Sequence, residues 1–187
     1  MDPMRIRPAI AAMTGYTPGE QPREPDIIKL NTNENPYPPS PAVVRALREF
    51  DPASLRRYPD PMCDALRARI AEIHGVRMEQ VLVGNGSDEL LALCVRALVP
   101  RDAAVGWFEP SYSLYPVLAA VEELRAAPTE LGPDFEWREP QVEGVALFLL
   151  THPNAPTGGL YPAETIADFR ARFRGVLAVD EAYVDFA

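Results

Sequence analysis

The chain has 187 residues, of which 47% are hydrophobic and 24% charged, a balance typical of a soluble globular domain and not of a disordered chain. Its formal net charge of −9, with scattered basic residues, disfavours nucleic-acid binding, although backbone amides can still bind phosphate-bearing small molecules. Cys63, Cys94, His74 and His152 lack the spacing of a disulfide framework or a zinc site. Because no segment reads as a signal peptide or a membrane span, a cytoplasmic protein is expected.

Residues 1–40 are predicted to form an extended arm. Its "NTNENPYPPSP" segment is rich in turn residues, and residues that precede proline disfavour the helical conformation. Helices are predicted over 41–50, which begins with proline, and over 61–75, which ends at a glycine. The expected organisation is therefore an arm over 1–40 and a larger domain over 41–187.

From residue 81 onwards, apolar runs alternate with helical patterns. The runs that predict strands are 81–86, 103–110, 122–127, 145–153 and 175–183. The segments that predict helices are 87–99, 113–121 and 162–173, with Ser87 as the expected N-cap of the first. Unbroken apolar strands alternating with helices predict a three-layer α/β/α fold with a mostly parallel sheet.

Ligands bind such sheets at the carboxyl ends of the strands, where polar segments occur in this sequence. "GNGSDE" at 84–89 is typical of an anion-binding helix start, or of an ordinary capped helix. Tyr112 and Tyr115 fit either packing or ligand stacking. Asp180 closes an apolar strand, which requires a cationic or hydrogen-bonding partner unless this strand end is solvated.

Six ordered motifs carry a resemblance that covers nearly the whole chain from about residue 25. They are "LNTNENPYPPSP", "RRYPDP", "VLVGNGSDELL", "EPSYSLYP", "THPNAPTGGLYP" and "VLAVDEAYVDF". In this order and spacing they resemble the amino-terminal half of the histidinol-phosphate aminotransferase family, a branch of the fold-type I enzymes that use pyridoxal 5'-phosphate (PLP). The resemblance implies that the fold is the large domain of a PLP-dependent transferase.

The resemblance also implies a role for individual residues. Asp180 would pair with the protonated ring nitrogen of PLP, Tyr112 would stack on the ring, and Tyr183 would bond its phenolic oxygen. The residues that would hold the cofactor phosphate are Gly86, Ser87 and Asp88, together with Tyr58, which would reach across a homodimer interface. The residues that would help cover the substrate are Tyr16 and Asn33.

Two features depart from the family pattern. Where the family has an asparagine before Pro-Thr-Gly, this chain has Ala155, and Asn154 is the expected substitute for contact with the phenolic oxygen. The family's Schiff-base lysine lies downstream of the last motif, whereas the one lysine here, Lys29, precedes the motifs and is expected at a surface strand position. The chain is thus expected to be part of a longer polypeptide, with no catalytic lysine and no transaminase activity of its own.

The function that the resemblance implies is transfer of an amino group between histidinol phosphate and 2-oxoglutarate, a step of histidine biosynthesis. Three alternatives stay open. A related fold-type I enzyme would act on aromatic amino acids or decarboxylate threonine phosphate. A non-catalytic module would bind or regulate. A NAD-dependent dehydrogenase is disfavoured because its glycine fingerprint is absent.

Overall fold

The computed structural model describes residues 6–13 and 26–187, which fall into two compact units. The sheet unit holds the described residues 6–13 and 84–187, and the helical unit holds residues 26–83. This division falls at Val83 and Gly84 and reflects compactness alone. The division into an arm over 1–40 and a domain over 41–187 stays a prediction.

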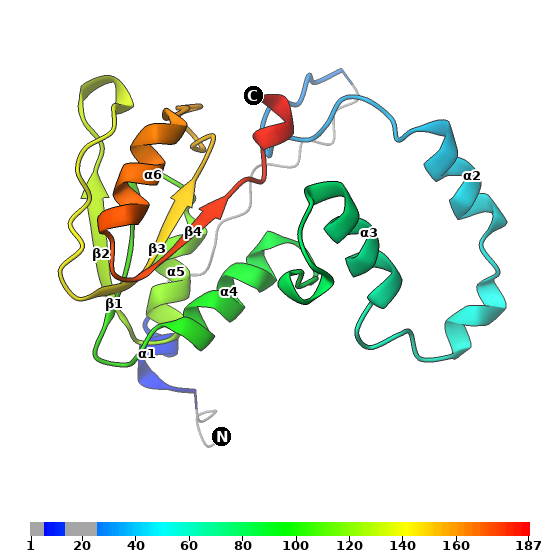
Figure 1. The fold of residues 1–187 in the computed structure, drawn as a ribbon, viewed down its shortest axis with the longest axis horizontal. Coiled ribbons are helices and arrows are strands. Elements are labelled where there is room, and N and C mark those ends of the chain that lie inside the picture. The colour runs from blue at the N-terminus through cyan, green and yellow to red at the C-terminus, as the bar shows by residue number, and fades with distance from the viewer. Residues whose placement is uncertain (1–5, 14–25) are drawn as a thin grey trace. The chain divides into compact units, whose positions relative to one another are not determined.

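The sheet unit contains four parallel strands, β1 (Ala104–Glu109), β2 (Arg125–Glu130), β3 (Val145–Thr151) and β4 (Val176–Asp180). They lie side by side in the order β2-β1-β3-β4 (Figure 1). Thr151 and Asp180, the last residues of β3 and β4, are direct neighbours in the register. The carboxyl ends of these strands therefore meet at one edge of the sheet.

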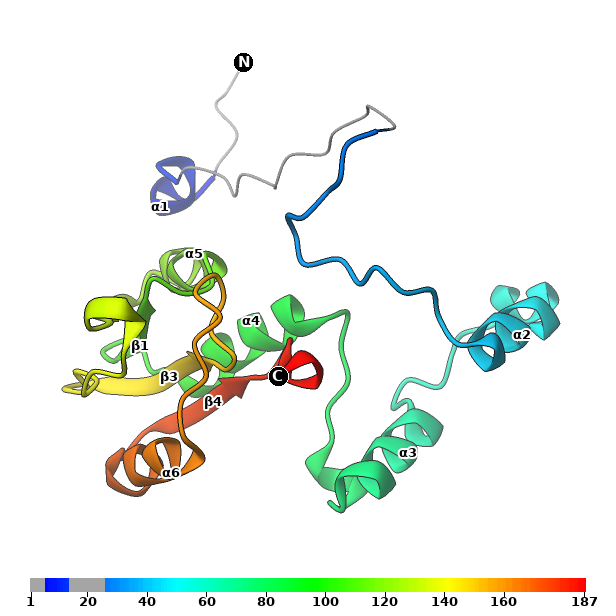
Figure 2. The same cartoon turned by 90° about the horizontal axis from the view of Figure 1, so that it is seen from above.

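Helices cover both faces of this sheet. The helices α4 (Ser87–Leu98) and α5 (Leu114–Val121) pack on one face, and α6 (Ala163–Arg172) packs on the other, as Figure 2 shows for α5 and α6. Since side chains alternate along a strand, neighbouring residues of β3 enter different cores, Leu147 and Leu149 on the α4 and α5 face and Phe148 and Leu150 on the α6 face. The predicted three-layer α/β/α fold is confirmed.

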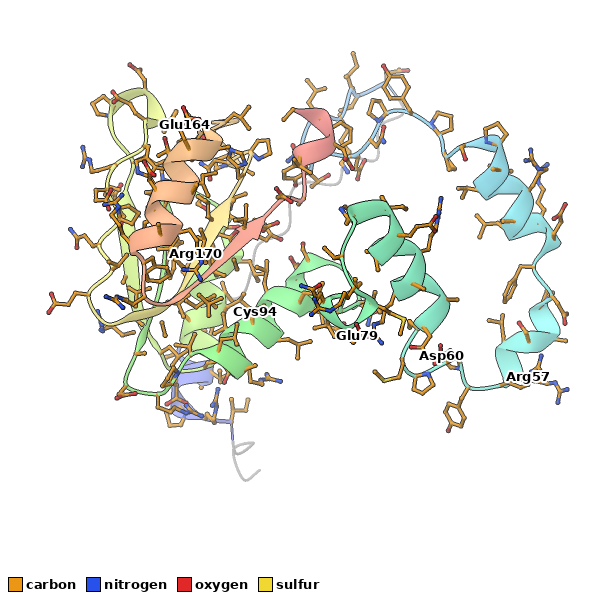
Figure 3. All side chains as sticks on the ribbon, viewed as in Figure 1. Arg57, Asp60, Glu79, Cys94, Glu164 and Arg170 are labelled. Carbon is orange, nitrogen blue, oxygen red and sulfur yellow. The ribbon has the colours of Figure 1, made fainter. Side chains whose placement is uncertain are left out.

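Local sequence features stabilise these helices. Figure 3 labels Glu164 in the first turn of α6 and Arg170 in its last turn, where each charge opposes the end of the helix dipole.

Two other contacts lie beside this sheet. Cys94, labelled on α4 in Figure 3, is a half-buried free thiol that packs against the core beneath this helix. The short helix α1 (Pro8–Ala11) contacts α5, and the preceding Arg7 pairs with Glu123 at 3.3 Å.

The helical unit contains α2 (Pro41–Glu49), α3 (Asp64–His74) and the 3-10 turns η1 (Pro52–Arg56) and η2 (Met78–Gln80). Gly75 ends α3 in a left-handed conformation, φ +64°, as the sequence predicts. Arg67 ties α3 to the segment after it, because Nε donates to the carbonyl of Val81 at 2.8 Å and Nη2 to that of Met78 at 2.9 Å. Residues 26–40 form neither helix nor strand.

Four sequence predictions about these elements are wrong. Residues 81–86 form no strand, and the backbone of Val81 bonds locally, its N–H to Met78 and its carbonyl to Arg67. The third predicted strand, 122–127, begins three residues later as β2. Ser87 is the first residue of α4 and not its N-cap, which is Gly86. The expected strand around Lys29 is also absent, and the side chain of Lys29 instead pairs with Glu34.

The sheet unit also contains two 3-10 turns, η3 (Pro133–Phe135) before β3 and η4 (Val184–Phe186) after β4. None of the helices within residues 6–13 and 26–187 has the length and apolar character needed to cross a bilayer.

Candidate functional site

The carboxyl edge of the sheet gathers three of the polar segments noted in the sequence. The segment after β1 carries Ser111 and Tyr112, the segment after β3 carries Asn154, and β4 ends at Asp180. The start of α4 joins them, because the hydroxyl of Tyr112 donates to Oδ1 of Asp88 at 3.0 Å. Segments more than ninety residues apart in the chain thus meet in one cluster within the sheet unit.

Asp180 is half-buried, and the protein holds both of its carboxylate oxygens. Oδ2 accepts a hydrogen bond from the hydroxyl of Tyr115 at 3.0 Å, and Oδ1 accepts one from the backbone N–H of Ala182 at 3.3 Å. The partner that an acid at the end of an apolar strand requires is therefore present. An ionised carboxylate offers about four acceptor positions, so Asp180 can still accept a hydrogen bond from a ligand.

Tyr115 is fully buried beneath this carboxylate. Its hydroxyl oxygen lies 2.6 Å from Oγ1 of Thr151, and its ring meets that of Tyr112 edge to face at 5.7 Å between centroids. Burial raises the pKa of Tyr115 far above its ordinary value, and the negative charge of Asp180 raises it further. Tyr115 therefore stays protonated, and remains a donor, above the pH at which an exposed tyrosine ionises.

Asn154 is buried with 3% of its surface exposed, and it anchors the loop that follows β3. Its Nδ2 donates to the carbonyl of Pro110 at 3.0 Å and to Oγ1 of Thr157 at 2.9 Å. Its backbone also closes the turn, since its carbonyl accepts from Gly158 at 2.7 Å and its N–H donates to Gly159 at 2.8 Å. As placed, Asn154 has no side-chain N–H left to donate to a ligand.

The start of α4 carries the other predicted contacts of this edge. Gly86, Ser87 and Asp88 are exposed, and no side chain caps the helix. The N–H groups of a first helical turn have no acceptor within the helix, so they are available to an anion. Gly86 has φ +84°, a conformation that favours glycine, and no atom beyond its two neighbours in the chain lies within 4 Å of where a Cβ would be.

The remaining predicted residues are not brought into this cluster by any described contact. Tyr183 is half-buried and follows Asp180 by three positions, just before η4. Asn33 and Tyr58 lie exposed in the helical unit, Tyr58 with its whole surface accessible. Tyr16 lies outside the described residues.

Sequence reasoning missed the hydroxyl groups that support Asp180. In the sequence Tyr115 fits either packing or ligand stacking, and the motifs assign no role to Thr151 or Ser111, yet the three hydroxyls form a hydrogen-bonded line that ends at the carboxylate. A signal was present for Thr151, because it is a polar residue at the end of an apolar run. The structure adds the register that sets Thr151 beside Asp180.

Comparison with known proteins gives this cluster a family context. A family model for aminotransferase class I and II matches residues 25–187. Histidinol-phosphate aminotransferase of Citrifermentans bemidjiense is 45% identical over 184 residues, which are 97% of this chain and 53% of that protein. The enzyme of the same name from Chromohalobacter salexigens is 46% identical over 185 residues, 96% of this chain and 51% of that protein. The chain thus spans about half the length of these relatives.

Solved structures show the same fold. The crystal structure of histidinol-phosphate aminotransferase from Sinorhizobium meliloti in complex with pyridoxal-5'-phosphate superposes with a TM-score of 0.80 at 23% identity, covering 98% of this chain and 52% of that one. The crystal structure of L-threonine-O-3-phosphate decarboxylase from Porphyromonas gingivalis superposes with a TM-score of 0.65 at 23% identity, covering 78% of this chain and 44% of that one. With a family model matched from residue 25 to residue 187, the chain belongs to the aminotransferase class I and II family.

Proposed function

We propose that the protein is a PLP-dependent aminotransferase that moves an amino group between histidinol phosphate and 2-oxoglutarate, giving imidazole-acetol phosphate and glutamate. The observation that carries this proposal is the Asp180 carboxylate, held at the end of β4 by Tyr115 and linked through Tyr115 and Tyr112 to the start of α4. An acid, an aromatic face and a set of free helix amides suit the three parts of the cofactor, its ring nitrogen, its ring and its phosphate.

The acid has the chemistry that the ring nitrogen requires. When bound, PLP supplies an electron sink that accepts charge from the substrate's alpha carbon, and this sink is strongest when its ring nitrogen is protonated. A carboxylate beside that nitrogen holds the proton there by charge pairing. Asp180 is suited to this because its two oxygens are oriented by protein donors and still have acceptor capacity.

The other residues would bind and orient the cofactor and the substrate. Tyr112 would cover one face of the ring, and the amides of Gly86, Ser87 and Asp88 would hold the phosphate. Tyr183 would donate to the phenolic oxygen. We further propose a cytoplasmic homodimer in which the exposed Tyr58 reaches the partner's phosphate site and Tyr16 and Asn33 help enclose the substrate.

The choice of substrate is supported by the relatives, since proteins between 41% and 46% identical to this chain carry the name histidinol-phosphate aminotransferase. The test uses the native polypeptide that contains these 187 residues. Purified protein with PLP is given histidinol phosphate, phenylalanine or threonine phosphate, each with 2-oxoglutarate, and glutamate and carbon dioxide are measured. Glutamate should form fastest with histidinol phosphate. Faster turnover of phenylalanine, or release of carbon dioxide from threonine phosphate, would contradict the proposed substrate.

A further inference from the structure

A line of three hydroxyl groups inside the sheet unit ends at the carboxylate of Asp180. Oγ of Ser111 lies 3.1 Å from Oγ1 of Thr151, which lies 2.6 Å from the Tyr115 hydroxyl, which donates to Asp180 at 3.0 Å. Tyr115 has 0% of its surface exposed and Thr151 has 3%. Polar groups buried to this degree normally form hydrogen bonds, because an unpaired buried polar group destabilises the fold.

The carboxylate fixes the direction of every hydrogen bond in this line. An ionised carboxylate only accepts, so Tyr115 must give its single proton to Asp180. The oxygen of Tyr115 is then the acceptor from Thr151, and Thr151 is the acceptor from Ser111. Each donor strengthens the next by polarising it, and the final bond is charge-assisted. The chain has one polarity and it ends on Oδ2 of Asp180.

The elements that carry these groups are firmly placed. Thr151 and Asp180 are register partners on β3 and β4, and Tyr115 lies in the first turn of α5, which packs on the same face of the sheet. Tyr115 also packs edge to face against Tyr112, with the ring planes at 86°. One buried side chain therefore contacts both the acid proposed to meet the ring nitrogen and the aromatic ring proposed to cover the cofactor.

From this geometry we infer that Tyr115 and Thr151 are positioning residues, which hold the Asp180 carboxylate in the orientation that pairs with the ring nitrogen of the cofactor. This inference rests on the proposed function. Neither residue touches the reacting atoms. Their effect is to keep Oδ2 fixed, so that the pairing with the ring nitrogen costs no reorganisation of the carboxylate.

The test compares four variants of the native polypeptide. Tyr115→Phe removes the last donor and keeps the ring, while Thr151→Val removes the hydroxyl before it at nearly constant volume. Thr151→Ser keeps that hydroxyl. The matched control is Tyr161→Phe, which removes the hydroxyl of another buried tyrosine, 7% exposed, in the core on the opposite face of the sheet.

Two quantities are measured for each variant. One is the dissociation constant of PLP, from a fluorescence titration. The other is the pH midpoint at which the bound ring nitrogen loses its proton, read from the chemical shift of PLP labelled with nitrogen-15. The titratable groups that face Tyr115 are Asp180 and Tyr112, so both must be intact in all four variants.

Tyr115→Phe is expected to weaken PLP binding about tenfold and to move the midpoint to lower pH, because a carboxylate free to turn pairs less well with the ring. Thr151→Val should shift both quantities in the same direction by a smaller amount. Thr151→Ser and Tyr161→Phe should stay within about twofold of the parent. A Tyr115→Phe variant that binds like Tyr161→Phe, or whose midpoint stays or rises, overturns the inference.

A fifth variant, Asp180→Asn, separates this inference from the proposed function. If the parent protein shows no saturable PLP binding, or if Asp180→Asn binds as the parent does, both the proposed function and the inference are wrong. If Asp180→Asn is impaired while Tyr115→Phe and Thr151→Val are not, only the inference is wrong. Circular dichroism checks folding, and should Tyr115→Phe fail to fold, Thr151→Val against Thr151→Ser decides the matter alone.

Discussion

The hydroxyl of Tyr115 donates a 3.0 Å hydrogen bond to Oδ2 of Asp180, although the two residues are 65 positions apart in the chain. This contact joins the first turn of α5 to the end of β4 across the face of the sheet. A buried phenol and a half-buried acid therefore lie together at the carboxyl edge of the sheet, where helix α4 also begins.

The buried phenol predicts a loss of stability at alkaline pH. Because burial raises the pKa of Tyr115 above its ordinary value of about 10, the unfolded chain releases this proton first as the pH rises. The stabilisation is fully present below about pH 10 and declines above it, by at most about 1.4 kcal/mol per pH unit. In urea unfolding between about pH 9 and pH 11, Tyr115→Phe should flatten this decline. Tyr37→Phe, at an exposed tyrosine, is the control; equal slopes in the parent and Tyr115→Phe would refute the prediction.

Asn154→Ala should lower the free energy of unfolding by about 1–3 kcal/mol, because the carbonyl of Pro110 and the hydroxyl of Thr157 lose their amide donor. The matched control is Asn85→Ala, since Asn85 is exposed and its side-chain amide contacts only the Glu89 side chain, at 3.3 Å or more. Chemical denaturation measures both variants. Equal stabilities for the two would show that the buried amide does not anchor this loop.

Gly175→Ala should destabilise the sheet unit by about 1–3 kcal/mol through overpacking. A Cβ at Gly175 would lie 2.5 Å from the carbonyl oxygen of Ala146 and 2.5 Å from Cζ of Phe173, and the backbone oxygen cannot move away without disturbing β3. At Gly132 the nearest atoms would be 3.5 Å away and φ is −70°, so Gly132→Ala should change stability by no more than about 0.5 kcal/mol. Thermal unfolding compares them, and a tolerated Gly175→Ala would mean that the approach of these two segments is looser than described.

Much of this fold follows from the sequence because the strongest patterns are local. The unbroken apolar runs at 103–110 and 145–153 predict the central strands β1 and β3, and Gly75 predicts the end of α3. The run at 81–86 also starts with three apolar residues, yet it forms no strand. A strand needs a neighbour for its backbone bonds, and a pattern along one segment says nothing about whether that neighbour exists.

The candidate site, like the fold, can be predicted from the sequence only in part. Asp180 and Tyr112 stand out in the sequence because an acid ends an apolar strand and an aromatic residue follows another. The support from Tyr115 and Thr151 does not stand out, because it depends on the register of β3 and β4 and on the face of the sheet on which α5 packs. The hydrogen bond by which Asn154 anchors its loop is also not predictable from the sequence, since its partner Pro110 lies 44 positions away.

If Tyr112 stacks on the cofactor as proposed, its aromatic ring and its hydroxyl should have separable effects on PLP binding. The ring would supply the stacking surface, while the hydroxyl bonds to Asp88. Tyr112→Ala should therefore weaken PLP binding about tenfold, whereas Tyr112→Phe should weaken it by no more than about threefold. A fluorescence titration with PLP gives both values. A larger loss in Tyr112→Phe than in Tyr112→Ala would place the interaction in the hydroxyl and remove the stacking role.

The nitrogen-15 chemical shift of labelled PLP measures most directly whether Asp180 pairs with the cofactor's ring nitrogen. In the native polypeptide the bound ring nitrogen should be protonated at neutral pH. Asp180→Asn, which removes the charge at constant shape, should leave this nitrogen unprotonated and bind PLP at least about tenfold more weakly. A protonated nitrogen and unchanged affinity in Asp180→Asn would contradict the assignment of this edge of the sheet as the cofactor site.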